Sequence, residues 1–352
     1  MSNYLIMAGG TGGHIFPALA VAQKLQKMGH EIVWLGSDGS METNIIPKYN
    51  IKLETIPIKG IRANGLKRKL LLPFTLTKSI ANVRKIIQRN QIKGAVGFGG
   101  FVSFPGGIAA KLSGIPLIIH EQNAIAGLSN KVLANIADQV FYAFPKTFSN
   151  TDGLIGNPIR ETIVSISSPE ERFLSFKNHL HMLVVGGSLG ARVFNEQIPL
   201  MLSLIPKDKR PSVKHQCGKN NLGMVKALYE ELAVDAEVIE FIDDMAYEYS
   251  HSDFVVCRSG ALTVSELAAA GLGGYLIPFP FAVDDHQTYN AKYLVEGKAV
   301  KCIEQANLSI EQMAESIQRL TREQCLAWAK NARKLAIFNA DQKIADRIVS
   351  LS

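Results

Sequence analysis

Two glycine-rich stretches of the chain have the composition of phosphate-binding loops. GGTGGH at residues 9–14 follows the apolar run 4–7, and GGSLGAR at 186–192 follows the apolar run 182–185. A glycine loop between a strand and a helix presents backbone N–H groups, and the positive end of the helix dipole, to an anion. The first loop is not the dinucleotide fingerprint G-x-G-x-x-G, because Gly10 and Gly12 would require a third glycine where Ile15 stands.

RSGALTVSE at residues 258–266 is a third stretch of this kind. It follows the predicted strand 253–257 and begins a predicted helix. We expect the N–H groups at the start of this helix to face a diphosphate; the residues are Ala261, Leu262, Thr263, Val264 and Ser265. Glu266 follows within this helix, close enough to reach past the phosphates and accept hydrogen bonds from both hydroxyls of a ribose. The alternative is an ordinary surface glutamate.

Other polar residues stand where predicted strands end. The Ser188 hydroxyl suits a phosphate oxygen, although its loop could be only a tight turn. Gln287 has both a donor and an acceptor for a pair of sugar hydroxyls. Arg160 can pair with phosphate through two N–H groups, or can be a solvated linker charge. Ile242 can present backbone groups to the edge of a flat ring, or can pack in the core.

His14 is the predicted general base, because an imidazole titrates near neutral pH and this one ends the first loop. Alternatively, His14 hydrogen-bonds the loop or binds a diphosphate. His120 and Glu121, at the end of the apolar run 116–119, are rival bases.

The composition indicates a folded protein of two domains. The chain has 352 residues, of which 47% are hydrophobic and 20% charged. Its four cysteines are widely spaced, which argues against a disulfide framework or a zinc site and fits a reducing compartment. No signal peptide is evident, and the apolar stretch 261–283 contains Glu266 and two prolines, which disfavours a membrane span.

Charge is distributed unevenly along the chain. Residues 1–157 carry a net charge of +10 and residues 158–352 a net charge of −3, which together give the +7 of the chain. The N-terminal half is therefore expected to face something anionic. Within it, an apolar segment is flanked by cations, as in proteins that dock on anionic lipid; the predicted membrane patch is Lys67, Arg68, Lys69, Leu70, Leu71, Leu72 and Phe74. The alternative is a helix with a core face and solvated lysines.

Strand-like and helix-like stretches alternate throughout the chain. Short β-rich runs occur at 30–36, 94–100 and 115–121, and again at 212–218, 236–242, 253–260 and 273–279. This predicts an α/β protein with parallel sheets covered on both faces. The duplicated strand–loop–helix start predicts two Rossmann-like domains facing across a cleft, at residues 1–160 and 161–336. We expect one basic helix at about 325–350, whose end at about 337–352 packs back on the first domain.

Eight motifs occur in an order that resembles the MurG family of GT-B-type glycosyltransferases. They are GGTGGH (9–14), GFGGFVSFPGG (97–107), HEQN (120–123), GNPIR (156–160), GGSLGAR (186–192), EFIDDM (240–245), CRSGALTVSELAAAG (257–271) and DDHQTYNA (284–291). The resemblance covers nearly the whole chain. It implies an inverting transfer of GlcNAc from UDP-GlcNAc to the 4-hydroxyl of undecaprenyl-pyrophosphoryl-MurNAc-pentapeptide (lipid I), which makes lipid II for peptidoglycan on the cytoplasmic face of the inner membrane.

The resemblance also implies roles for individual residues. Asn123 and Arg160 match donor-site contacts, and Glu266 matches the ribose ligand. The first loop then faces the acceptor, through Thr11, Gly12 and Gly13. No cofactor and no obligatory metal are implied. Two positions depart from common members of the family: Leu189 stands where many have glutamine, and Phe101 stands where some have tyrosine, so Phe101 is given no proton-transfer role.

Two other function classes stay open at this point. UDP-GlcNAc 2-epimerases share the double-Rossmann plan and would release a free epimer without a lipid acceptor. A non-enzymatic protein that binds an anionic ligand such as nucleic acid would use the basic half. We expect no nucleic-acid partner, because the chain lacks aromatic stacking platforms and a basic recognition helix.

Overall fold

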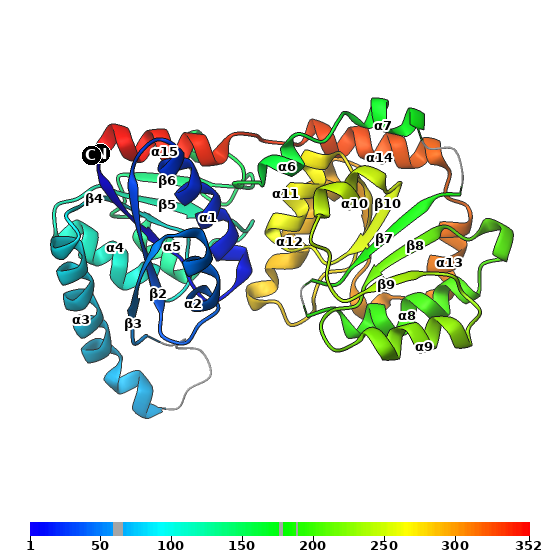
Figure 1. The fold of residues 1–352 in the computed structure, drawn as a ribbon, viewed down its shortest axis with the longest axis horizontal. Helices are drawn as coiled ribbons and strands as arrows, with labels where there is room; N and C mark the ends of the chain where they lie inside the picture. Colours follow the sequence, from blue (N-terminus) through cyan, green and yellow to red (C-terminus); the bar gives the residue numbers. More distant parts are fainter. Residues whose placement is uncertain (59–65, 176–178, 188) are drawn as a thin grey trace. The chain divides into compact units, whose positions relative to one another are not determined.

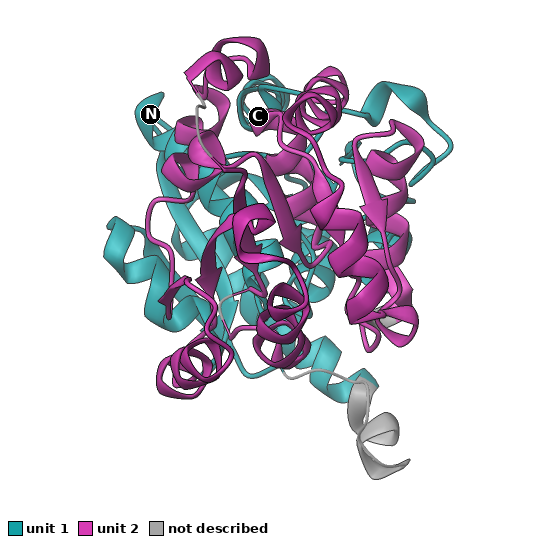
Figure 2. Cartoon of the chain, turned by 90° about the vertical axis from the view of Figure 1, so that its right-hand side faces the viewer, with its two compact units in different colours: residues 1–159, 337–352 teal, residues 160–336 magenta. Residues whose placement is uncertain are grey.

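The computed structural model describes residues 1–58, 66–175, 179–187 and 189–352; for residues 66–72 and 283 it describes the backbone alone. The chain divides into two compact units (Figures 1 and 2). Unit 1 comprises residues 1–159 and 337–352, and unit 2 comprises residues 160–336.

Unit 1 is built on a six-stranded parallel sheet with the order β3-β2-β1-β4-β5-β6. Its strands are β1 (Asn3–Met7), β2 (Glu31–Ser37), β3 (Lys52–Ile56), β4 (Ile92–Gly97), β5 (Leu117–Glu121) and β6 (Gln139–Tyr142). Its helices are α1 (Gly12–Lys27), α2 (Glu42–Ile45), α3 (Leu66–Arg89), α4 (Ser103–Leu112), α5 (Leu128–Leu133) and α15 (Ala340–Leu351).

Both faces of this sheet are buried, as expected for parallel strands. Tyr4 and Ile6 of β1 pack into a core with α1 and α15, whereas Leu5 and Met7 point to the opposite core with α3 and α4. Because side chains alternate along a strand, one apolar run fills two cores. This explains why the strand sequences are continuously apolar.

Unit 2 repeats the plan with the strand order β12-β11-β10-β7-β8-β9, all parallel. Its strands are β7 (His181–Val185), β8 (Ser212–Gln216), β9 (Glu237–Ile239), β10 (Phe254–Cys257), β11 (Gly274–Leu276) and β12 (Val300–Cys302). Its helices are α6 (Glu161–Val164), α7 (Pro169–Ser175), α8 (Arg192–Ser203), α9 (Leu222–Glu231), α10 (Met245–His251), α11 (Ala261–Ala270), α12 (His286–Glu296), α13 (Ile310–Gln318) and α14 (Arg322–Lys334).

The core on one face of the second sheet joins the strands to α8, α9 and α13. Phe254 and Val256 of β10 pack there with Phe194 of α8 and Tyr229 of α9. Val255 and Cys257 therefore point to the other face of the sheet. With this arrangement in both units, the prediction of two Rossmann-like α/β domains with parallel sheets is confirmed.

The expectation of one continuous C-terminal helix is wrong. Helix α14 ends at Lys334, and α15 begins only at Ala340, after Asn339 in the left-handed conformation (φ 64°). Within unit 1, Ile344 and Ile348 of α15 are buried in the same core as α1. Asn339 tolerates positive φ better than most residues, which suits it to this break.

The strand order determines where a ligand can bind in each unit. In each sheet, the chain reverses its direction of progress at the central pair, β1–β4 in unit 1 and β7–β10 in unit 2. Ligands of open α/β sheets bind beside the carboxyl ends of the strands at this switch point. The loops that leave these four strands are GGTGG and GFGG in unit 1, and GGSLG and RSGA in unit 2.

Candidate functional site

The first glycine loop leads directly into α1. Thr11 is the N-cap residue, with an extended backbone, and the helix begins at Gly12. The side chain of Thr11 does not cap the helix. Gly12 and Gly13 therefore stand where helical N–H groups are directed out of the helix. This is the arrangement expected of an anion site, and it brings Thr11, Gly12, Gly13 and His14 together on one turn.

His14 is held at the first turn of α1 between this loop and the loop after β4. Its Nδ1 lies 3.3 Å from the Thr11 hydroxyl. A Cβ atom at Gly99 would lie only 3.1 Å from His14 Nε2, so the imidazole packs against the bare backbone of Gly99, whose φ is +96°. The side chain is partly exposed. A residue larger than glycine at position 99 would both strain the backbone and press on the predicted base.

Glu121, the rival base, is a buried carboxylate that organises the loop after β5. Its Oε1 accepts hydrogen bonds from the backbone N–H of Asn123 (3.0 Å) and from Asn123 Nδ2 (3.2 Å). Its Oε2 accepts from the backbone N–H of Gly127 (3.0 Å) and from Asn130 Nδ2 (2.9 Å). Four donors occupy the lone pairs of this carboxylate. The geometry therefore favours a role in orienting Asn123 over a role as proton acceptor.

His120, the other rival, is fully buried. Its Nε2 lies 2.8 Å from the carbonyl of Gly156, and its Nδ1 lies 3.0 Å from Gln122 Nε2. Burial lowers the pKa of His120 to about 4, despite the opposing bond to Gly156. A neutral imidazole with both nitrogens engaged joins two segments of unit 1 and is poorly suited to accept a proton from a substrate.

In unit 2, the loop after β10 opens α11. Gly260 is the N-cap residue and has no side chain with which to cap the helix. The first helical positions are the expected ones, Ala261, Leu262, Thr263, Val264 and Ser265. Just before them, Ser259 is buried, and its hydroxyl has no hydrogen-bond partner among the described residues.

Glu266 lies further along α11 and is paired with Arg160. Its Oε1 accepts from Arg160 Nη2 at 2.9 Å and from Arg160 Nε at 3.1 Å. Its Oε2 lies 3.4 Å from the hydroxyl of Tyr249, which is buried. The carboxylate side chain is 12% exposed and that of Arg160 is 50% exposed. Burial raises the pKa of Glu266, and the Arg160 charge opposes this rise. The structure thus joins two predicted site residues from α11 and the segment before α6.

Gln216, at the end of β8, links two loops on the same edge of the sheet. Its Nε2 donates to the carbonyl of Gly187 (2.9 Å), and its Oε1 accepts from the backbone N–H of Ile242 (3.0 Å). Gln216 is 2% exposed. Because the N–H of Ile242 is used in this way, the carbonyl is the backbone group of Ile242 that remains for a ligand.

Gln287 lies in the first turn of α12, where its side-chain oxygen accepts from the backbone N–H of Phe279 at 2.9 Å. Its amide nitrogen is the group that remains for a sugar hydroxyl.

Some predicted site residues fall outside the described part of the chain. Ser188 does so, as do the side chains of Lys67, Arg68, Lys69, Leu70, Leu71 and Leu72. Phe74 is described, and 78% of its surface is exposed. Among the described residues, no group of three or more His, Cys, Asp or Glu side chains could hold a metal ion.

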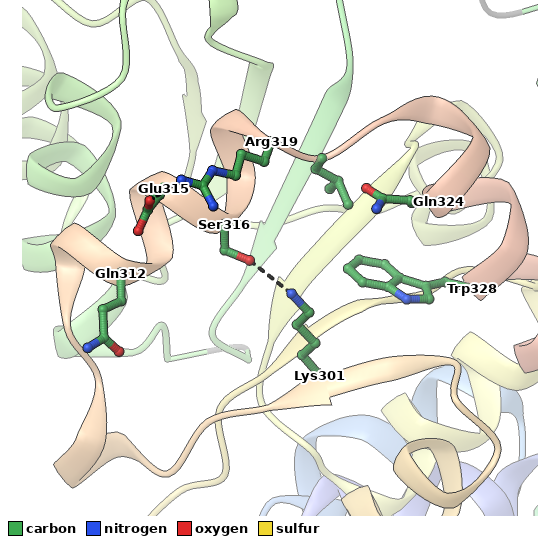
Figure 3. A pocket seen from close by; sticks show the side chains of 8 residues that line it. Lys301, Gln312, Glu315, Ser316, Arg319, Gln324 and Trp328 are labelled. Carbon is green, nitrogen blue, oxygen red and sulfur yellow. Dashed lines mark hydrogen bonds and ion pairs between the residues drawn. The ribbon is translucent and has the colours of Figure 1, made fainter.

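A pocket of about 450 Å³ lies elsewhere in unit 2, between β12, α13 and α14 (Figure 3). Lys301 Nζ donates to Ser316 Oγ across it at 3.0 Å, and Trp328 lines one side. None of the predicted site residues lines this pocket. The residues that line this pocket belong to β12, α13, α14 and the turn between the two helices, and not to the loops at the switch point. We therefore do not assign the pocket to the site.

Three polar residues at these loops were missed by reasoning from sequence. Gln216 and Glu42 each contact a loop that carries predicted site residues, and Tyr249 contacts Glu266 of α11. The only signal for Gln216 was a polar residue at the end of a predicted strand, two positions before Gly218. Tyr249 and Glu42 lie outside the motifs, and their contacts depend on how separate segments pack.

Family models match both halves of the chain. The glycosyltransferase family 28 N-terminal domain matches residues 4–142, and the glycosyltransferase family 28 C-terminal domain matches residues 181–348. The chain belongs to glycosyltransferase family 28.

Two curated relatives and a solved structure are similar to this chain over nearly its full length. A Neisseria gonorrhoeae protein named UDP-N-acetylglucosamine–N-acetylmuramyl-(pentapeptide) pyrophosphoryl-undecaprenol N-acetylglucosamine transferase is 53% identical over 99% of this chain and 98% of its own length. A Marinobacter nauticus protein of the same name is 47% identical over 98% and 96%. The crystal structure of Acinetobacter baumannii MurG has 38% identity and a TM-score of 0.89, covering 99% of this chain and 100% of its own.

Membership of family 28 decides among the function classes that the sequence left open. The chain is a glycosyltransferase of the MurG type, with the GT-B fold, and the resemblance read from its motifs is confirmed. A UDP-GlcNAc 2-epimerase from Neisseria meningitidis has a TM-score of 0.68 but only 14% identity over 99% of this chain. That likeness shows a common fold alone.

Proposed function

We propose that this glycosyltransferase transfers GlcNAc from UDP-GlcNAc to the 4-hydroxyl of lipid I, with inversion at the anomeric carbon, and so forms lipid II for peptidoglycan. The observation that carries the proposal is 53% identity over 99% of the chain to a relative whose name states this donor and acceptor. The geometry described for each unit is consistent with it.

The donor binds unit 2 in this proposal. The diphosphate lies at the N-termini of α8 and α11, where the helix dipoles, and backbone N–H groups without a partner inside the helix, favour negative charge. The ribose binds Glu266, the uracil meets the backbone of Ile242, and Gln287 binds the sugar. Arg160 is released from Glu266 by the ribose hydroxyls and pairs with a phosphate. The two helix termini also stabilise the charge that develops on the leaving UDP.

The acceptor binds unit 1, where its diphosphate faces Thr11, Gly12 and Gly13. When Nδ1 of His14 carries the proton and donates to Thr11, Nε2 presents its lone pair to the acceptor hydroxyl. As the acceptor oxygen bonds to the anomeric carbon, its proton passes to His14 Nε2 and the bond from that carbon to the UDP oxygen breaks. Asn123, oriented by Glu121, contributes a further contact to the sugar-nucleotide donor.

The acceptor is a lipid, so we also propose that the enzyme acts at the cytoplasmic face of the inner membrane as a peripheral protein. No helix in the described part of the chain is long and apolar enough to cross a membrane. The exposed Phe74 on α3 belongs to the predicted membrane patch of residues 67–72 and 74. An apolar tip flanked by cations binds anionic lipid through both the hydrophobic effect and charge.

Transfer of radiolabelled GlcNAc to a lipid I analogue tests the proposed function. The expected products are a labelled lipid and one UDP for each GlcNAc transferred. Incubation with UDP-GlcNAc alone separates the isomerase alternative, because an epimerase would form a free epimer without the lipid. Release of that epimer, with no label in the lipid, would contradict the proposal.

A further inference from the structure

Glu42 is a carboxylate buried behind the first glycine loop. It is the first residue of α2, and none of its surface is exposed. No ion pair compensates its charge among the described residues. A charged group is buried at a high cost unless strong hydrogen bonds replace its water. Its partners therefore show what this carboxylate holds in place.

Three donors meet the carboxylate. Oε1 accepts from the backbone N–H of Ser37 at 2.8 Å and from the Ser37 hydroxyl at 3.2 Å. Oε2 accepts from the backbone N–H of Gly10 at 3.2 Å, in the loop that leads into α1. One oxygen thus anchors Glu42 to the end of β2, while the other binds the loop.

Two glycines make room for this side chain. A Cβ atom at Gly9 would lie 2.5 Å from Glu42 Oε1, and one at Gly36 would lie 2.7 Å from Glu42 Cγ. On its other side the loop meets Gly100, where a Cβ atom would lie 2.4 Å from the carbonyl oxygen of Gly9. The loop at Gly9 is therefore confined by Glu42 on one side and by Gly100 on the other. Of these two neighbours, Glu42 is the carboxylate.

We propose that Glu42 is a positioning residue for the acceptor half of the reaction. By binding the N–H of Gly10 it fixes the direction of the loop and hence the first turn of α1, which carries Thr11 and His14. Because Gly10 has no Cβ atom, several backbone conformations are open to it. The hydrogen bond selects one of them, with a φ of +92°. This inference rests on the proposed function of that loop.

The argument for a functional role is the direction of the contact. A carboxylate that only stabilised the packing of β2 would be satisfied by Ser37, two of whose donors it already accepts. The third bond crosses to another segment, 32 residues away in the chain, and ends at Gly10, in the loop that leads to the predicted base. At 3.2 Å the bond is long for a contact with a carboxylate, but hydrogen bonds to an ionised acceptor are stronger than neutral ones, which suits this bond to hold a glycine-rich segment.

The test compares Glu42→Gln with the matched control Glu54→Gln. Glutamine keeps the shape but has only one acceptor oxygen, and its NH₂ group would face a donor. Glu54 is a carboxylate of the same unit that pairs with Arg89 near the surface. We expect kcat/KM for the lipid I analogue to fall roughly 10- to 100-fold in Glu42→Gln and to change less than about threefold in Glu54→Gln. UDP affinity should be unchanged in both, because the donor binds unit 2.

Glu42→Asp keeps the test decisive if the glutamine variant does not fold. The shorter side chain retains the charge near Ser37 but is one methylene too short to keep the Gly10 contact as well. We expect the same loss of kcat/KM, with a melting temperature close to that of the parent. Parental kcat/KM in a folded Glu42 variant, or an equal loss of UDP affinity, would overturn the inference. Absence of transfer by the parent and by Glu54→Gln would instead contradict the proposed function.

Discussion

Arg160 and Glu266 form the ion pair at the start of the proposed donor site, with Arg160 Nη2 2.9 Å from Glu266 Oε1. The carboxylate is largely buried, whereas half of the arginine side chain is exposed. Ribose hydroxyls that bind Glu266 must therefore compete with a guanidinium. A guanidinium that is displaced toward the diphosphate exchanges one anionic partner for another, which limits the cost of the exchange. The pair thus connects recognition of the ribose to recognition of the phosphates.

Glu266→Gln is expected to weaken UDP binding without unfolding the protein. The variant loses charge-assisted hydrogen bonds worth roughly 1.5–3 kcal/mol, which corresponds to about 10- to 150-fold in affinity. Isothermal titration calorimetry measures the effect. Glu315→Gln is the control, since Glu315 pairs with Arg319 on the exposed side of α13, away from the helix termini of the proposed donor site. Parental UDP affinity in Glu266→Gln would show that this carboxylate has no part in donor binding.

Arg160→Met is expected to have opposite effects on UDP and on uridine. The variant lacks the phosphate partner, so UDP should bind roughly 10-fold more weakly. Uridine has no phosphate, and it should bind at least as well as in the parent because Glu266 is no longer occupied. Titration of both ligands into both proteins gives the comparison. An equal loss for uridine and UDP would mean that Arg160 supports the fold or contacts the nucleoside.

Gln216→Glu is expected to weaken UDP binding by disturbing two loops at once. The carboxylate still accepts from Ile242 but cannot donate to the carbonyl of Gly187, and two acceptors then face each other in a buried position. We expect a loss of roughly 10-fold in UDP affinity. Gln312→Glu, on an exposed part of α13, should bind UDP normally. Normal binding by Gln216→Glu would show that the two loops keep their positions without this bridge.

Replacement of Leu71, Leu72 and Phe74 by serine in one variant is expected to release the enzyme from anionic vesicles, while UDP binding stays intact. The variant loses the apolar surface that lipid would bury, and the flanking cations alone bind weakly. High salt should weaken vesicle binding of the parent protein through charge screening. Vesicle co-sedimentation measures both effects, and Leu174→Ser, which changes an apolar residue of unit 2 that is 83% exposed, is the control. Sedimentation of the triple variant like the parent would exclude the patch.

The sequence predicted the central strands of both sheets and the edge strand β9, but not the edge strands β3, β6 and β12. Residues 4–7 and 254–257 are buried on both faces, so their apolar runs predicted strands directly. Strand β3 (52–56) is half exposed, and β12 (300–302) is only three residues long; each pairs on one side alone. Such edge strands form because a neighbour offers hydrogen bonds, which no local pattern reveals. The break at Asn339 depends likewise on where α15 packs.

The same division holds for the site. Glycine loops and helix starts are local features, so the stretches around Thr11 and Ala261 could be found by spacing. The contacts that set the role of Glu121, or that join Arg160 to Glu266, involve the packing of segments. A carboxylate next to a predicted active-site loop can act as a base or can hold the loop in place. Only the hydrogen-bond donors that surround the carboxylate distinguish the two roles.

The final prediction concerns His14 and separates proton transfer from acceptor binding. If His14 Nε2 accepts the proton, His14→Gln should lower kcat roughly 10²–10⁴-fold, because glutamine keeps a hydrogen-bonding side chain but takes up no proton near neutral pH. The acidic limb of the pH–rate profile should disappear, since it reports protonation of the base. UDP affinity should be unchanged.

His14→Ala distinguishes this role from a diphosphate contact. A base role predicts that alanine and glutamine variants lose kcat to a similar extent, whereas a binding role predicts a rise mainly in the acceptor KM and retention of the acidic limb. Steady-state kinetics with the lipid I analogue across pH 5–9 gives both quantities. Near-parental kcat in His14→Gln would exclude the imidazole as base. The proton would then have to leave through another group, and Glu121 is an unfavourable substitute because four donors already surround its carboxylate.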